Sequence, residues 1–151
     1  MPDNKKKRTK MQLTESSIYI NLKRLRNLLY EAQFRMTTAN RVVFGNTLMK
    51  YSAETISNFV LAFTVGDKKL EYLELSLGYF AVLRDDLLFC IEQNIIQYRR
   101  RKKNDVDEDK ADEDFVNGRK VELFRLVAQI DNDICKWRAS LAKGKSGTHN
   151  R

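Results

Sequence analysis

Residues 18–36 read IYINLKRLRNLLYEAQFRM, and the apolar pattern of this stretch decides the fold class. Its apolar residues recur at alternating steps of four and three, the spacing that keeps them on one side of a helix. The resulting stripe consists of Ile18, Leu22, Leu25, Leu29, Ala32 and Met36. One amphipathic helix must bury such a stripe against other elements, so its packing partners lie elsewhere in the chain.

Three further segments carry the same kind of pattern. They run from Thr38 to Phe63, from Leu70 to about Tyr98, and from Val116 to Leu141. Between the first two, Gly66 could adopt a positive φ at a helix end and Asp67 could cap the next helix. Proline occurs only at position 2, which leaves these segments free to be helical. We therefore predict an all-α chain, folded as an antiparallel up-and-down four-helix bundle.

The length and composition predict one domain. A chain of 151 residues with 42% hydrophobic content suffices for one ordinary core. We expect a basic flexible N-terminal arm over residues 1–13, the four-helix bundle over 14–142, and a basic flexible tail over 143–151. Within the bundle, residues 99–114 are expected to form a charged linker between the third and fourth helices.

The charge balance indicates the class of partner. The chain carries a formal net charge of +8 and has a pI near 9.5, so its surface should attract a polyanion, nucleic acid first. It has no run of about 18 uncharged apolar residues and no signal-peptide pattern, so we expect a cytoplasmic protein without membrane contact. Cys90 and Cys135 form no CxxC pair and are expected to be two buried thiols, with no metal site and no cofactor.

The linker has two interpretations. Arg99-Arg100-Arg101-Lys102-Lys103 carries five positive charges at the expected end of the third helix, and residues 104–114 contain seven acids and one lysine. In one interpretation, the acidic stretch is a disordered loop whose charges simply cancel those of the basic run. In the other, it covers the basic run and competes with RNA for it.

Cations on the first and fourth helices supply the candidate binding residues. On the fourth helix, Arg125, Lys136 and Lys143 fall in one sector opposite the apolar stripe. The first helix adds cations interspersed with Tyr19, Tyr30 and Phe34, whose rings could stack on unpaired bases or contact a protein partner. We assign Tyr30 and Phe34 to a partner interface. The expected nucleic-acid-binding residues are Lys23, Arg24, Arg26, Arg99, Arg100, Arg101, Arg125, Lys136 and Lys143.

The third helix carries a second apolar face. Leu75, Val82 and Phe89 follow each other at heptad spacing, nearly opposite the main stripe, with Gly78 and Ile96 on the same side. One helix cannot turn both faces into a four-helix core. We therefore expect these residues to form a self-association interface.

Two segments carry a family resemblance. Arg41-Val42-Val43-Phe44-Gly45 and the segment Tyr72-Leu73-Glu74-Leu75-Ser76-Leu77-Gly78-Tyr79-Phe80 resemble the signatures of a bacterial four-helix-bundle superfamily. It includes proteins encoded in 23S ribosomal RNA intervening sequences and the accessory variability determinant, Avd, of diversity-generating retroelements. The intervening-sequence branch usually has a proline and then Ala-Glu-Gly at the end of the second helix, where this chain reads ISNFVLAF over residues 56–63. That departure favours the Avd-like branch.

The Avd resemblance implies a homopentameric, barrel-shaped, basic assembly that binds the retroelement reverse transcriptase and its template RNA. It would support mutagenic cDNA synthesis without catalysing a reaction. The implied partners are RNA or an RNA/DNA hybrid, the reverse transcriptase, and other copies of the chain. The alternatives are an RNA-binding bundle of the ribosomal intervening-sequence type and a purely structural oligomeric adaptor.

No catalytic motif is found in the sequence. Asp85-Asp86 and the pair Glu71 and Glu74 have no Glu-x-x-His segment to complete a metal-bridging site. The segment at residues 144–147, GKSG, lacks the earlier glycine of a phosphate-binding loop. We therefore expect the protein not to be an enzyme.

Overall fold

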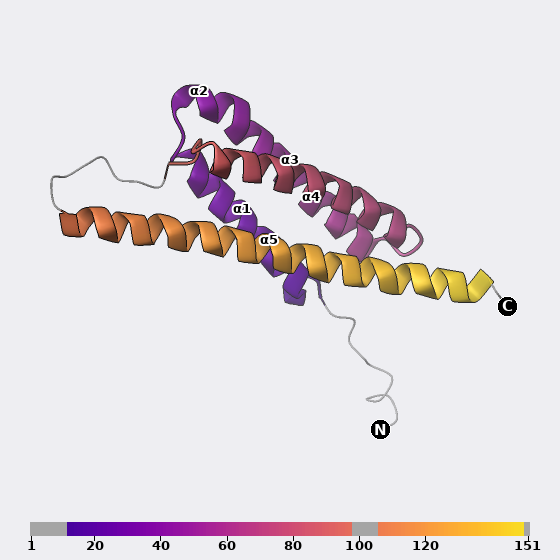
Figure 1. Cartoon of the computed structure of the whole chain (residues 1–151). Coiled ribbons are helices and arrows are strands. Elements are labelled where there is room, and N and C mark those ends of the chain that lie inside the picture. The colour runs from indigo at the N-terminus through magenta and orange to yellow at the C-terminus, as the bar shows by residue number, and fades with distance from the viewer. Residues whose placement is uncertain (1–11, 98–105, 150–151) are drawn as a thin grey trace.

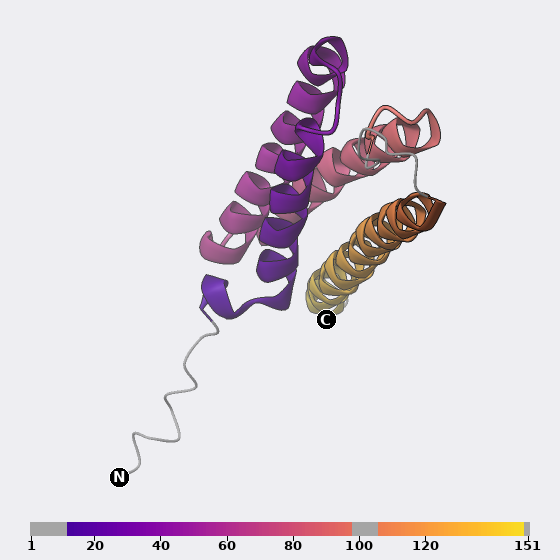
Figure 2. The ribbon, with the colours of Figure 1, turned by 90° about the vertical axis from the view of Figure 1, so that its left-hand side faces the viewer.

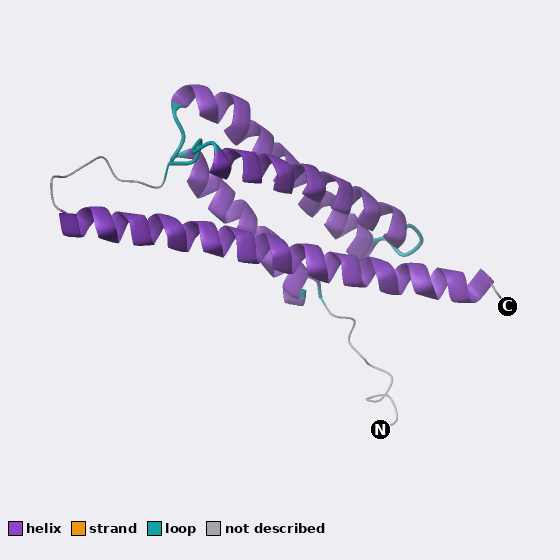
Figure 3. Ribbon diagram, in the orientation of Figure 1, coloured by secondary structure: helices purple, strands orange, loops and turns teal. Residues whose placement is uncertain are grey.

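The computed structural model describes residues 12–97 and 106–149, and within this part every regular element is helical (Figure 3). Four long helices make up most of it: α1 (Ser17–Gln33), α3 (Asn46–Thr64), α4 (Lys69–Glu92) and α5 (Val106–His149). The shorter segments are the 3-10 turn η2 (Leu13–Glu15), α2 (Thr38–Asn40) and a π-helical segment (Arg41–Gly45) that continues directly into α3 (Figure 1). The all-α prediction is confirmed.

Each long helix packs mainly against two others. Helix α1 contacts α3 and α5, and α4 contacts the same two helices. Figure 2 shows α5 on the side of α1 and α4. The stripe predicted for α1 faces the core, with Leu22, Leu25, Leu29, Ala32 and Met36 all buried and Ile18 packed at its edge.

Small polar residues bring α3 and α4 close together. The Ser76 hydroxyl of α4 donates a 2.7 Å hydrogen bond to the carbonyl oxygen of Thr55 on α3, and both residues are fully buried. The Thr55 hydroxyl donates to the Tyr51 carbonyl, also at 2.7 Å. The two hydrogen bonds give each hydroxyl group a partner where the close packing of α3 and α4 excludes water.

Side-chain capping bonds mark the starts of α1 and of α2, which leads into α3. The Ser16 hydroxyl accepts from the backbone N–H of Tyr19, and the Thr37 hydroxyl accepts from that of Asn40. In the π-helical segment, Arg41 Nε donates a 3.0 Å bond to the Gln33 carbonyl at the end of α1. Gly45 is buried where an added Cβ would lie 3.2 Å from the Gln33 side chain.

The turn between α3 and α4 differs from the prediction. No described glycine has a positive φ, and the residue that ends α3 is Val65 in an extended conformation. The N-cap of α4 is Lys68, without a side-chain capping bond, so Asp67 does not cap the helix. Gly66 has open space around its Cα, and the turn does not need its conformational freedom.

Helix α4 ends at Glu92, earlier than the predicted end near Tyr98. Asn94 has a φ of 55°, a left-handed conformation that asparagine tolerates better than most residues. The chain then folds back: Ile95 N–H donates to the Cys90 carbonyl at 2.9 Å, and Gln97 N–H donates to the Arg35 carbonyl at 2.8 Å. Ile96 is therefore 3% exposed in the core and does not belong to the outward face of α4.

Helix α5 is longer than the sequence indicated. The helix begins at Val106. Residues 106–114, which the sequence assigned to a charged linker over 99–114, therefore form its first turns. Acidic residues at a helix N-terminus interact favourably with the helix dipole, which gives this stretch a reason to be helical. The backbone also stays helical to His149, through most of the expected tail. The expected basic run 99–103 lies outside the described residues.

Candidate nucleic-acid interface

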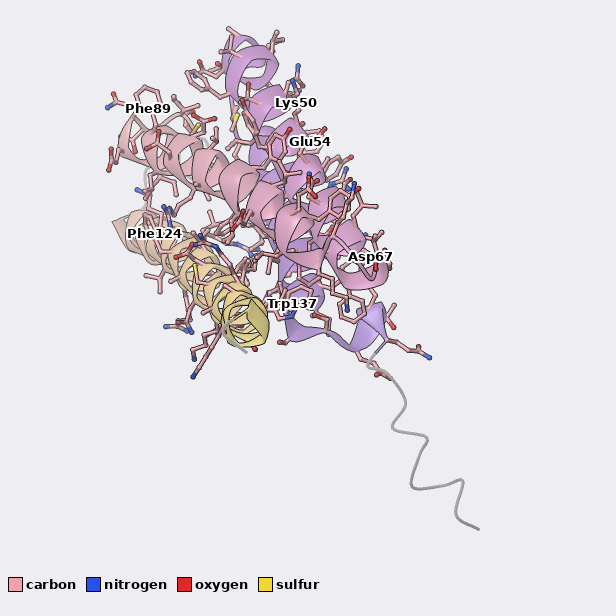
Figure 4. The ribbon with its side chains drawn as sticks, turned by 90° about the vertical axis from the view of Figure 1, so that its right-hand side faces the viewer. Lys50, Glu54, Asp67, Phe89, Phe124 and Trp137 are labelled. Carbon is pink, nitrogen blue, oxygen red and sulfur yellow. The ribbon has the colours of Figure 1, made fainter. Side chains whose placement is uncertain are left out.

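The outer side of α5 carries three exposed cations. Arg125, Lys136 and Lys143 are all exposed, and none forms a salt bridge among the described residues. The buried Val127 and Ile134 lie on the opposite side of the helix. We call Arg125, Lys136 and Lys143 the α5 cationic face. Figure 4 shows nitrogen-bearing side chains projecting from α5 away from α3.

Other arginines of the bundle are engaged in ion pairs between helices. Arg84 on α4 pairs with Asp131 on α5 at 3.3 Å, and Arg138 on α5 pairs with Glu74 on α4 at 3.6 Å. Arg119 joins α5 to Glu31 on α1 at 3.7 Å. These three arginines therefore bridge α5 to its neighbours, whereas the α5 cationic face forms no ion pair among the described residues.

The structure separates Arg24 from Lys23 and Arg26. Arg24 pairs with Glu122 on α5 at 2.9 Å and, together with Arg125, lines a groove of about 310 Å³ between α1 and α5. Two of the predicted binding residues thus meet at one groove. Sequence periodicity alone could not place Arg24 and Arg125 at one groove, because that placement depends on which helix α1 packs against.

Lys23 and Arg26 lie on the other flank of α1, among aromatic side chains. Lys23 Nζ lies 5.8 Å from the centroid of the Tyr19 ring. Tyr30 and Phe34, assigned from sequence to a partner interface, are 57% and 58% exposed and contact each other edge to face at 5.2 Å. We call Tyr19, Lys23, Arg26, Tyr30 and Phe34 the α1 stripe.

Arg41 belongs next to this stripe, although sequence reasoning did not select it as a binding residue. Its guanidinium lies 5.3 Å from the centroid of the Phe34 ring. The only sequence signal was its position at the start of a signature segment. Arg99, Arg100 and Arg101, by contrast, fall outside the described residues.

The outward face of α4 exposes apolar side chains, and the helix as a whole is acidic. Leu75, Val82 and Phe89 are 46%, 42% and 45% exposed, as their heptad spacing predicted. The Phe89 ring leans on Phe44, with the centroids 5.7 Å apart. Helix α4 contains two basic and five acidic residues, a net charge of −3.

Two groups near this face have altered acidity. Burial raises the pKa of Asp86, and the neighbouring Asp85 carboxylate raises it further. Burial, followed by the charge of Asp86, raises the pKa of the Cys90 thiol to about 11. Cys90 is buried as expected, but the prediction for Cys135 is wrong because it lies exposed, outside the apolar stripe of α5.

An aromatic hollow of about 390 Å³ lies where α1 begins. Its walls include Phe59, Phe63 and Trp137, and Trp137 packs edge-on against both phenylalanines at 5.5 and 6.3 Å. Figure 4 labels Trp137 beside η2. These rings extend the hydrophobic core to the molecular surface.

The described residues contain neither a metal-binding cluster nor a membrane-spanning helix. No group of three or more His, Cys, Asp or Glu side chains there is placed to hold a metal ion. None of the helices in that part of the chain combines the length and apolarity needed to cross a membrane. Comparison of the chain with protein-family models, curated proteins and solved structures found no match.

Proposed function

We propose that this protein binds RNA through the α5 cationic face and acts as a non-catalytic accessory protein. The observation that carries the proposal is the contrast among its cations. Arg24, Arg84, Arg119 and Arg138 form ion pairs at helix contacts, whereas Arg125, Lys136 and Lys143 project without an acidic partner in the described structure. Unpaired cations along one helix side suit the regularly spaced phosphates of a nucleic acid.

The particular system we propose is a diversity-generating retroelement, in which the protein binds the reverse transcriptase and its template RNA to support mutagenic cDNA synthesis. Support comes from the resemblance to Avd in two segments. Arg41–Gly45 forms the π-helical segment that approaches Gln33 closely, and Tyr72–Phe80 includes Ser76, which joins α4 to α3. Both segments thus lie at close helix contacts, where the residue type is tightly constrained.

The proposal includes an antiparallel bundle assembled into a homopentameric barrel. Helix α4 has a net charge of −3 beside its exposed apolar residues, whereas residues 118–144 of α5 contain six basic and three acidic residues, a net charge of +3. In the proposed assembly, the exposed apolar face of α4 contacts a different surface of the next copy, so that the α5 cationic face stays available to RNA. Such a head-to-tail contact closes into a ring when the rotation between copies permits.

Charge reversal tests the RNA-binding proposal. The triple variant Arg125→Glu, Lys136→Glu and Lys143→Glu should weaken binding to a fluorescent RNA by about 100-fold or more, since each lost phosphate contact also becomes a repulsion. The matched control reverses Lys50 on α3, Lys68 in the α3–α4 turn and Lys69 at the start of α4, which changes the net charge equally. An equal loss in both variants would show that net charge alone governs binding and would reject the α5 site.

A structural adaptor is the second candidate, and the exposed α4 face favours it. Leu75, Val82 and Phe89 could serve protein docking without any contact to nucleic acid. An adaptor would leave RNA unbound in the absence of other proteins. A reverse transcriptase gene beside a variable repeat, next to the gene for this chain, would distinguish the retroelement assignment from a ribosomal intervening-sequence protein.

A further inference from the structure

The α1 stripe combines aromatic rings and cations along one side of a single helix. At about 100° per residue, its five members fall within a sector of roughly 80°. From Tyr19 to Phe34 the stripe spans fifteen residue-to-residue steps, which at about 1.5 Å per step gives roughly 22 Å. Two of its rings have a cation over their face: Lys23 lies over the Tyr19 ring, and Arg41 lies over the Phe34 ring.

The stripe has no acidic member. Glu31 is the one acidic residue of α1, and its carboxylate is directed to Arg119 on α5, 3.7 Å away. The other flank of α1 also directs Arg24 to α5, through its bond to Glu122. The ion pairs of α1 therefore lie on the α5 side, and the stripe is left with aromatic and cationic groups.

We propose that the α1 stripe binds the unpaired bases of single-stranded RNA, with Tyr30 and Phe34 as stacking platforms and Lys23 and Arg26 as phosphate contacts. This inference rests on the proposed RNA binding and specifies which form of RNA is selected. The α5 cationic face offers only charges, which single strands and duplexes both satisfy. Exposed rings stack on the face of a base only when that base is outside a duplex.

The charges of the stripe favour RNA over a protein as its occupant. Lysine is depleted in protein interfaces, whereas here Lys23, followed by Arg26, lies between the rings of Tyr19 and Tyr30 along α1. A single strand offers both a phosphate and an aromatic face at every nucleotide, and the single-strand sites of OB folds cover about 4–16 nucleotides each. A stripe of roughly 22 Å fits the lower end of that range.

The experiment compares two forms of one RNA. Fluorescence anisotropy would give the affinity of the wild-type chain for a 12-nucleotide single strand and for the blunt duplex of the same sequence. The double variant Tyr30→Leu and Phe34→Leu leaves an apolar side chain at both exposed positions and removes the two rings, together with the Tyr30 hydroxyl. We expect it to bind the single strand about fivefold or more weakly, and the duplex within about twofold of wild type.

A matched control removes apolar surface elsewhere. Val42→Ala with Val43→Ala truncates two exposed side chains on the π-helical segment and should leave both RNA affinities unchanged. Circular dichroism would confirm that each variant keeps its helical content, and the single variant Phe34→Leu provides a milder change at the more exposed ring.

Each result has a distinct meaning. Unchanged affinity of the ring variant for both RNAs would overturn the inference and assign the stripe to a protein partner. An equal loss for both RNAs would also overturn it, because a stacking platform must discriminate between them. If the wild-type chain bound neither RNA, the proposed RNA binding itself would fail, independently of the ring variants.

Discussion

At the scale of single residues, the two cysteines show how packing sets chemical behaviour. Cys90 is buried in α4, and its thiol has a pKa of about 11, raised by burial and then by Asp86. Cys135 lies exposed on α5. Helical periodicity predicted the burial of Cys90, but Cys135 follows the buried Ile134 directly and so points about 100° away from it. A sequence reading that counts cysteine simply as an apolar residue misses this difference.

Thiol labelling tests the difference between the cysteines. With a disulfide reagent at neutral pH, the folded chain should show one fast thiol and one thiol that reacts only when the protein opens. Only the thiolate is reactive, and both burial and the raised pKa keep Cys90 protonated. Cys135→Ser should abolish the fast phase. Two fast thiols in the wild-type chain would contradict the packing of α4.

Asp86 provides a pH-dependent prediction. Because its pKa is raised in the folded state, the folded chain holds this proton more tightly than the unfolded chain, and stability falls as pH rises through that pKa. Asp86→Asn should therefore increase the free energy of unfolding at pH 7, by a fraction of a kilocalorie per mole because water screens this half-buried group. Below the pKa that Asp86 has in the unfolded chain, the protonated carboxyl of the wild type is as uncharged as the amide of the variant. The stability gained by Asp86→Asn should therefore disappear there. Urea unfolding at several pH values would measure it.

At the scale of elements, the sequence predicts which segments are helices far better than where they end. The stripe from Leu22 to Met36 is buried as predicted because its 3.6-residue period follows directly from helix geometry. The end of α4 depends instead on one left-handed residue and on a hydrogen bond to Arg35, which is distant in sequence. No local pattern contains that bond.

The same limit applies to the candidate site. The exposure of Arg125, Lys136 and Lys143 could be predicted, because their sector lies opposite the apolar stripe of one helix. The pairing of Arg24 with Glu122 could not, because it depends on α1 packing beside α5. Sequence reasoning therefore grouped Arg24 with Lys23 and Arg26, and the structure separates them.

The end of α4 provides a stability test. Asn94→Val should destabilise the fold by about 1–2 kcal/mol, because a β-branched residue is strained at a φ of 55°. Asn94→Gly should be tolerated, since glycine adopts this conformation freely. Urea unfolding of the two variants checks the prediction, and equal stability of valine and glycine would show that Asn94 is not held in the left-handed region.

At the scale of the whole molecule, charge is distributed unevenly among the helices. The described side chains give α5 a positive net charge over residues 118–144, whereas α4 is negative and carries exposed Leu75, Val82 and Phe89. One face is thus suited to a polyanion and the other to association. Such a separation would let an assembled ring keep its cations available to RNA.

Self-association through α4 is tested by light scattering. We expect the wild-type chain to be oligomeric at micromolar concentration, and Leu75→Glu with Val82→Glu to dissociate it, because two charges would be buried without partners. Val42→Glu with Val43→Glu is the matched control, since these valines are 63% and 59% exposed on the π-helical segment. A monomeric wild-type chain would reject the assembly and weaken the retroelement assignment.

The salt dependence of RNA affinity tests the central claim most directly. Each phosphate neutralised contributes roughly −0.7 to −0.9 to the slope of log affinity against log salt concentration. The wild-type chain should therefore show a steep negative slope, and the triple reversal of Arg125, Lys136 and Lys143 should make it shallower by roughly two units or more. A wild-type affinity independent of salt, or a slope unaltered by that reversal, would contradict RNA binding through the α5 cationic face.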